Sequence, residues 1–99
     1  MERVAKSLCE LYGESFGGKQ NGRYRIPSKL VAEMAGRRRL YEDDIKQLTR
    51  ALLEEGFVLV DMETFYVILS AKTFTNYRRA NAEVIAHCLD EAKPRATLN

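Results

Sequence analysis

The apolar residues at the start of the chain recur at the spacing of one face of an α-helix. They follow one another at intervals of four, three, one and four residues, at Val4, Leu8, Leu11, Tyr12 and Phe16. Charged residues occupy the other faces, so this period predicts an amphipathic helix over residues 1–16. Three glycines then interrupt the pattern, and residues 17–23 are expected to form a flexible loop.

Extended and helical patterns alternate after this loop. Pro27 restricts Ile26 to extended geometry, which indicates a brief edge strand that begins at Tyr24. Ser28 is the expected N-cap of a helix that Gly36 ends.

A second helix is expected over residues 41–55, followed by Gly56. The acidic residues at its start favour the positive end of a helix dipole. Its expected buried face comprises Ile45, Leu48, Ala51 and Leu52, with Leu53 close to that face.

Two β-prone segments follow, at residues 57–60 and 65–69, and the four residues between them fit a hairpin loop. A final helix is expected within residues 73–92, from about Thr75 onward. Residues 93–99 follow it as a tail that is expected to fray. The apolar side of this last helix comprises Tyr77, Val84, Ile85, Cys88, Leu89 and Ala92.

The order of these elements resembles the winged helix-turn-helix domain of bacterial regulators. The resemblance covers residues 24–69: a helix ending in Gly, a turn, a second helix ending in Leu-Leu-Glu-Glu-Gly-Phe-Val, and an immediate hairpin. It implies an α+β fold, a winged helix-turn-helix with additional N- and C-terminal helices and a short β-hairpin wing. It also implies a function in holding double-stranded DNA.

The sequence departs from that pattern in two places. The segment from Gly36 to Ile45 is longer than the usual tight turn. The short hairpin carries Asp61 and Glu63 at its tip, where a wing that enters a minor groove normally carries Arg or Lys.

Length and composition predict one domain over residues 1–99 in a soluble, cytoplasmic protein. No apolar run approaches the roughly 20 residues needed to cross a bilayer, and the N-terminus lacks the pattern of a secretion signal.

The single His87 has no catalytic context and there is no phosphate-loop motif, so neither an enzyme nor a cofactor is expected. Cys9 and Cys88 are expected to be small apolar residues within helices rather than metal ligands, and their mutual contact is left open.

The net charge of +2 conceals two oppositely charged stretches. Residues 17–39 carry seven basic side chains against Glu33, which gives +6, whereas residues 40–63 carry two basic and seven acidic ones, which gives −5. The chain is therefore a charge dipole along its length.

The basic stretch supplies the candidate contacts to DNA. Three successive arginines stand just before the second helix of the motif, where guanidinium forks suit phosphate oxygens. Exposed residues of that helix have the geometry to read base edges, although any exposed helix face carries such residues, and a basic turn is often only solvated. The phosphate candidates are Arg37, Arg38, Arg39, Lys29, Arg23, Arg25 and Lys19, and the base-reading candidates are Lys46, Gln47 and Arg50. This hypothesis requires the seven phosphate candidates to converge on one surface.

Acidic residues oppose the same hypothesis and suggest an alternative. Glu42, Asp43 and Asp44 would face phosphates at the start of the reading helix, and the hairpin tip adds two more carboxylates. The alternative is a protein–protein adaptor that docks a basic partner on these acids without binding DNA. Under the leading hypothesis, a small DNA-binding regulator of transcription, two copies are expected to pair through the terminal helices and place their motifs about 34–36 Å apart.

Overall fold

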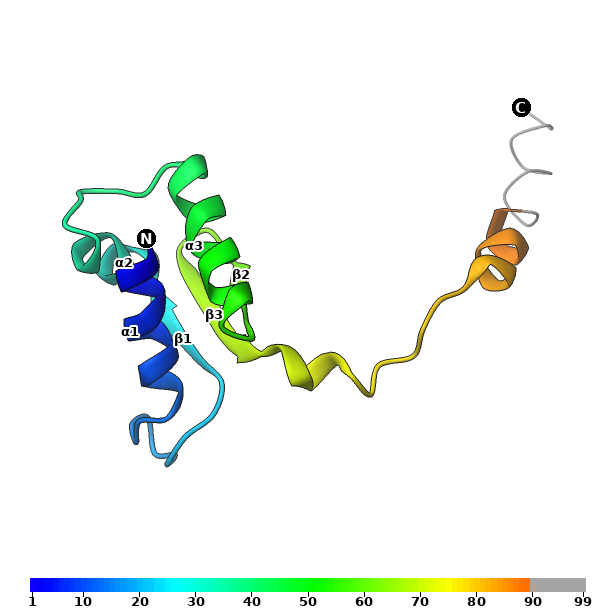
Figure 1. Cartoon of the computed structure of the whole chain (residues 1–99), viewed down its shortest axis with the longest axis horizontal. Helices are drawn as coiled ribbons and strands as arrows, with labels where there is room; N and C mark the ends of the chain where they lie inside the picture. Colours follow the sequence, from blue (N-terminus) through cyan, green and yellow to red (C-terminus); the bar gives the residue numbers. More distant parts are fainter. Residues whose placement is uncertain (90–99) are drawn as a thin grey trace.

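The computed structural model describes residues 1–89, and Figure 1 shows the order of their elements. A further helical stretch covers residues 82–89. The named elements are α1 (Glu2–Tyr12), β1 (Tyr24–Pro27), α2 (Ser28–Met34), α3 (Glu42–Glu54), β2 (Phe57–Asp61), β3 (Phe65–Ser70) and the 3-10 turn η1 (Ala71–Phe74).

The three strands form one antiparallel sheet in the order β1-β3-β2. The predicted edge strand and hairpin are both confirmed, with β3 in the centre. Because side chains alternate along a strand, the pairs Ile26–Tyr66 and Leu59–Ile68 lie on one face of the sheet. This α+β arrangement of helices and a three-stranded sheet is compatible with a winged-helix-like fold.

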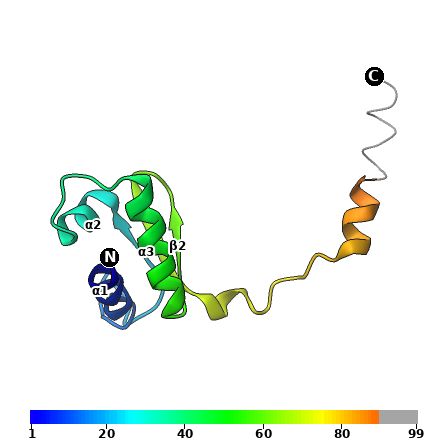
Figure 2. The same cartoon turned by 45° about the horizontal axis from the view of Figure 1, so that its top comes forward.

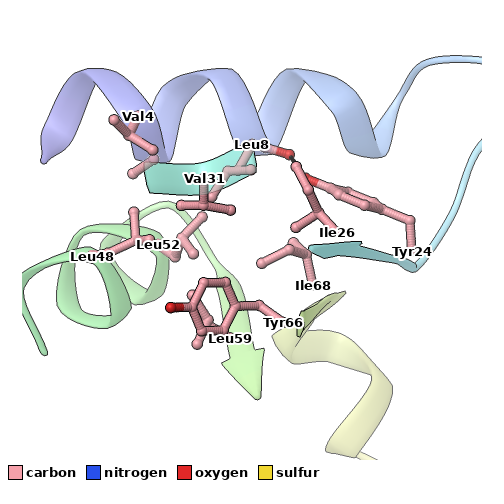
Figure 3. Packing of buried hydrophobic residues seen from close by; sticks show 11 residues of the cluster. Val4, Leu8, Tyr24, Ile26, Val31, Leu48, Leu52, Leu59, Tyr66 and Ile68 are labelled. Carbon is pink, nitrogen blue, oxygen red and sulfur yellow. Dashed lines mark hydrogen bonds between the residues drawn. The ribbon is translucent and has the colours of Figure 1, made fainter. Parts of the chain in front are cut away.

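The helices bury that face of the sheet. Each contributes to one apolar core: Leu8 from α1, Val31 from α2, and Leu48 and Leu52 from α3, all with no exposed surface. Figure 3 shows these side chains gathered around Ile68 of the central strand. Burying one such side chain contributes about 1.5–3 kcal/mol, so the core explains why the helical stripes of the sequence form these helices.

Helix α1 ends earlier than predicted, at Tyr12 rather than residue 16. Gly13 caps its C-terminus, and the chain then turns so that Phe16 is 44% exposed, with its ring edge-on to that of Tyr24. The Tyr24 hydroxyl donates a hydrogen bond of 2.5 Å to the Leu8 carbonyl, and burial raises the pKa of this phenol. That bond ties β1 to the last turns of α1.

Different hydrogen bonds stabilise the N-termini of α2 and α3. Ser28 is the first residue of α2 rather than its N-cap, and both its N–H and its hydroxyl donate to the Thr64 carbonyl of the hairpin at 3.0 Å. The prediction of a Ser28 cap was therefore wrong, because the hairpin engages this hydroxyl. At α3 the N-cap is Tyr41, whose N–H donates to the Asp44 carboxylate at 2.9 Å.

The C-terminal helix differs most from its prediction. Residues 75–81 are not helical, and the helix begins at residue 82, where the Asn81 side chain accepts a hydrogen bond from the Val84 N–H. Residues 75–89, here called the terminal arm, are all exposed and lead away from residues 1–74, the body (Figures 1 and 2). The described part of this helix does not pack on the body. Its predicted end and the tail lie outside the described residues.

The arm makes the molecule extended. The radius of gyration is 18.5 Å, whereas a compact domain of this length has about 12–13 Å. Cys9 is half-buried on α1 and Cys88 is exposed on the arm, and both thiols are free. Among residues 1–89, no helix is long and apolar enough to cross a bilayer.

Candidate nucleic-acid interface

The first of the three arginines is half exposed but is already paired with a residue of the body. The guanidinium of Arg37 donates a hydrogen bond to the carboxylate of Asp44 and forms an ion pair with it. The bond from the Tyr41 N–H does most to lower the pKa of Asp44, partial burial opposes the shift, and Arg37 adds to it. Asp44 is buried, so Arg37 neutralises a carboxylate that caps α3. The fold therefore uses one of the guanidinium groups that the sequence assigned to phosphate.

Arg38 and Arg39 stand together with Lys29 at the start of α3. All three line a hollow of about 410 Å³ between α2, the turn before α3 and the hairpin. Within residues 1–89 none of these three cations has a carboxylate at ion-pair distance. The guanidinium carbon of Arg39 lies 5.1 Å from the centre of the Tyr41 ring, within the range of a cation–π contact.

Two carboxylates line the same hollow. They belong to Asp61 and Glu63 of the hairpin, and Glu63 adopts a positive φ of 71° as its N–H donates to the Asp61 carboxylate. The hollow is therefore lined by side chains of both charges.

The other cations of the basic stretch lie elsewhere. Lys19, Arg23 and Arg25 line a second hollow, of about 420 Å³, beside the glycine-rich loop. Arg25 also extends over the Phe65 ring, with its guanidinium carbon 5.8 Å from the ring centre. Figure 1 shows this loop and the turn before α3 at opposite ends of the body. The expectation of a single electropositive surface was wrong, because β1 and α2 carry the chain from one end to the other.

The candidate reading residues lie on the exposed side of α3 but face two different hollows. The Lys46 Nζ atom lies 3.6 Å from the Oε1 atom of Glu42, one turn earlier, and both side chains are highly exposed. Gln47 lines a hollow between α3 and α1, together with Arg3 of α1. Arg50 lines this hollow and also a second one, which lies between α3 and the hairpin. The three side chains therefore spread around the helix rather than along one line.

The hollow between α3 and the hairpin holds a feature that the sequence did not reveal. Leu53 was expected near the buried face, yet it is 58% exposed there. We call this hollow of about 580 Å³ the α3–hairpin groove; Figure 2 shows α3 beside β2. The adjacent pair Leu52-Leu53 was the available signal, because neighbouring helical residues point in different directions and only one of the two fits the core stripe. The groove is lined by Glu42, Ile45, Lys46, Thr49, Arg50, Leu53 and Asp61.

Among residues 1–89, no three His, Cys, Asp or Glu side chains are grouped so that they could hold a metal ion. Comparison with known proteins adds no assignment: no family model, no curated protein and no solved structure matches this chain. Functional inference therefore rests on the geometry of the two surfaces beside α3.

Proposed function

We propose that this chain is a small winged-helix protein that binds double-stranded DNA and regulates transcription. In this proposal Lys29, Arg38 and Arg39 hold phosphates beside the start of α3. The exposed side of α3 then approaches the base edges through Lys46, Gln47 and Arg50. Helix order, sheet order and the hairpin that directly follows α3 support a winged-helix arrangement.

The seven phosphate candidates do not converge as the hypothesis from the sequence required, so this proposal is narrower than that hypothesis. It rests on one observation, that Lys29, Arg38 and Arg39 line the same hollow. Within residues 1–89 none of these three side chains has a carboxylate at ion-pair distance, although Asp61 and Glu63 line the same hollow. Long basic side chains that are not used within the fold favour phosphate oxygens as ligands.

A titration of labelled random-sequence duplex at low salt tests this proposal. Replacing Lys29, Arg38 and Arg39 by Ala should abolish most of the binding and reduce the salt slope by about 0.9 for each phosphate that is no longer neutralised. The matched control replaces the same number of charges at the other end of the body, at Lys19, Arg23 and Arg25, and should retain the slope. Absence of binding by the unaltered protein at micromolar concentration, or equal weakening in the two triple variants, would contradict the proposal.

A second candidate function is that of a protein–protein adaptor. It is favoured by the exposed Leu53 and by the carboxylates of Glu42, Asp61 and Glu63, which line the two hollows beside α3 and would repel phosphates there. An adaptor of this kind would take an amphipathic, basic segment into the α3–hairpin groove. The alanine triple variant at Lys29, Arg38 and Arg39 should then leave partner binding intact.

A further inference from the structure

We propose that the α3–hairpin groove receives the terminal arm of a second copy of this chain. The two surfaces have matching chemistry: the groove is apolar along α3 and acidic beside the hairpin, and the arm carries two arginines followed by an amphipathic helix. The proposal does not depend on DNA binding.

The arm has an apolar face that nothing in its own body covers. Val84, Ile85 and Leu89 are 50%, 53% and 56% exposed, and Cys88 is exposed on the same stripe, since these residues lie at helical spacing. Helices in proteins take most of their stability from packing such a stripe against another element. The helix over residues 82–89 lies apart from the body in both views (Figures 1 and 2), so its own body leaves this stripe open to another molecule.

The groove has the complementary apolar surface. Ile45 and Leu53 lie two turns apart on α3 with Thr49 between them, and this row forms the floor along which a helix can lie. Leu53 is more exposed than any other leucine of the body. A row of side chains at this spacing is the usual receptor for an amphipathic helix.

Charge fixes the direction in which the arm would lie. Arg78 and Arg79 precede the arm helix and have no carboxylate at ion-pair distance within residues 1–89. At the hairpin end of the groove, Asp61 lies two residues from Glu63, and neither carboxylate has a cation at ion-pair distance within residues 1–89. The other charged residues of the groove are Glu42 and Lys46, which pair with each other, and Arg50. The two arginines are therefore expected at the hairpin end and the arm helix along Leu53.

A second copy suits the groove better than the arm of the same chain. The arm leaves η1 in a direction away from the body in both views (Figures 1 and 2). Reciprocal exchange gives two identical arm–groove contacts related by a twofold axis, which is how isologous dimers double a small interface. The homodimer expected from the terminal helices then takes this form.

Analytical ultracentrifugation of the full chain over a wide concentration range tests the proposal. We expect a reversible monomer–dimer equilibrium, and we expect Ile85→Asp on the arm and Leu53→Asp in the groove each to weaken it about tenfold or more. Both residues are more than half exposed, so circular dichroism should show unchanged folding. Leu30→Asp is the matched control, since Leu30 is an exposed leucine of α2, 46% accessible, that does not line the groove.

Charge reversal tests the direction of docking. Replacing Arg78 and Arg79 by Glu should weaken the dimer, as should replacing Asp61 and Glu63 by Lys, and combining the four changes should restore it. A protein that stays monomeric up to about 0.5 mM would overturn the proposal. So would a dimer that Leu53→Asp leaves intact, which would mean that the arms pair with each other or with the sheet. No readout involves DNA, so a negative result in the duplex titration leaves this inference standing.

Discussion

The body and the terminal arm carry similar apolar stripes, but the stripe is buried in the body and exposed on the arm. In α3, Leu48 and Leu52 are completely buried against the sheet and α1. In the arm, Val84 and Leu89 remain about half exposed on a helix that lies apart from the body. The comparison teaches that an apolar helical period predicts a helix with an apolar face. The period does not predict which element packs on that face, because this depends on the direction in which the chain leaves the preceding element.

The largest difference between the two regions should appear in stability. Leu52→Ala removes a fully buried side chain and should lower the free energy of unfolding by about 2–5 kcal/mol. Leu89→Ala removes a side chain that is 56% exposed, and in the monomer it should change this free energy by no more than about 0.5 kcal/mol. Urea unfolding at low protein concentration measures both. Comparable decreases in the two variants would mean that the arm helix packs on its own body.

A smaller difference is expected between two tyrosines. Tyr24→Phe removes the hydroxyl that binds the Leu8 carbonyl inside the body and should cost about 1 kcal/mol. Tyr77 is 60% exposed in the arm, so Tyr77→Phe should leave the thermal midpoint unchanged. Equal midpoints for the two variants would show that the buried bond adds nothing to the attachment of β1 to α1.

The smallest expected effect concerns a carboxylate at a helix start, and it depends on pH. The lowered pKa of Asp44 means that its charged form stabilises the folded body. This contribution is complete above the unfolded-state pKa of about 3.9 and is lost as the pH falls through the lower folded-state pKa. Asp44→Asn should therefore reduce stability at neutral pH and make stability less sensitive to acid below about pH 4.

Glu83 provides the matching change on the arm. It lies in the first turn of the exposed helix, and Glu83→Gln should alter neither the stability of the monomer nor its acid dependence. Thermal melts at a series of pH values separate the two variants. If the melts of Asp44→Asn and the unaltered protein stayed parallel down to about pH 3, the carboxylate would have no role in holding Arg37 and Tyr41.

Much of the body followed from local signals in the sequence. Gly36 and Gly56 have φ values of 71° and 87°, a conformation that side chains rarely adopt, and they separate the helices of the motif and the hairpin where expected. Runs of β-branched and aromatic residues located both hairpin strands to within a residue. The early end of α1 also had a local signal in Gly13, although the apolar period beyond it suggested a longer helix.

The candidate site was less predictable, because its features depend on contacts between distant residues. The pairing of Arg37 with Asp44 spans seven residues and converts one expected phosphate ligand into part of a helix cap. Lys19 and Arg38 lie at different hollows because β1 and α2 carry the chain from one end of the body to the other. A count of charges along the sequence gives no information about this path. DNA binding and the residues that would make it remain predictions. The proposed phosphate contacts are now Lys29, Arg38 and Arg39.

Hydrogen exchange measured by mass spectrometry at two protein concentrations tests the contrast between body and arm most directly. We expect amides of α3 to be strongly protected at both concentrations. Amides of residues 82–89 should exchange rapidly in dilute protein and become protected as the concentration rises and arms enter grooves. Strong protection of residues 82–89 in dilute protein, matching that of α3, would contradict the account, because the arm would then be packed on its own body.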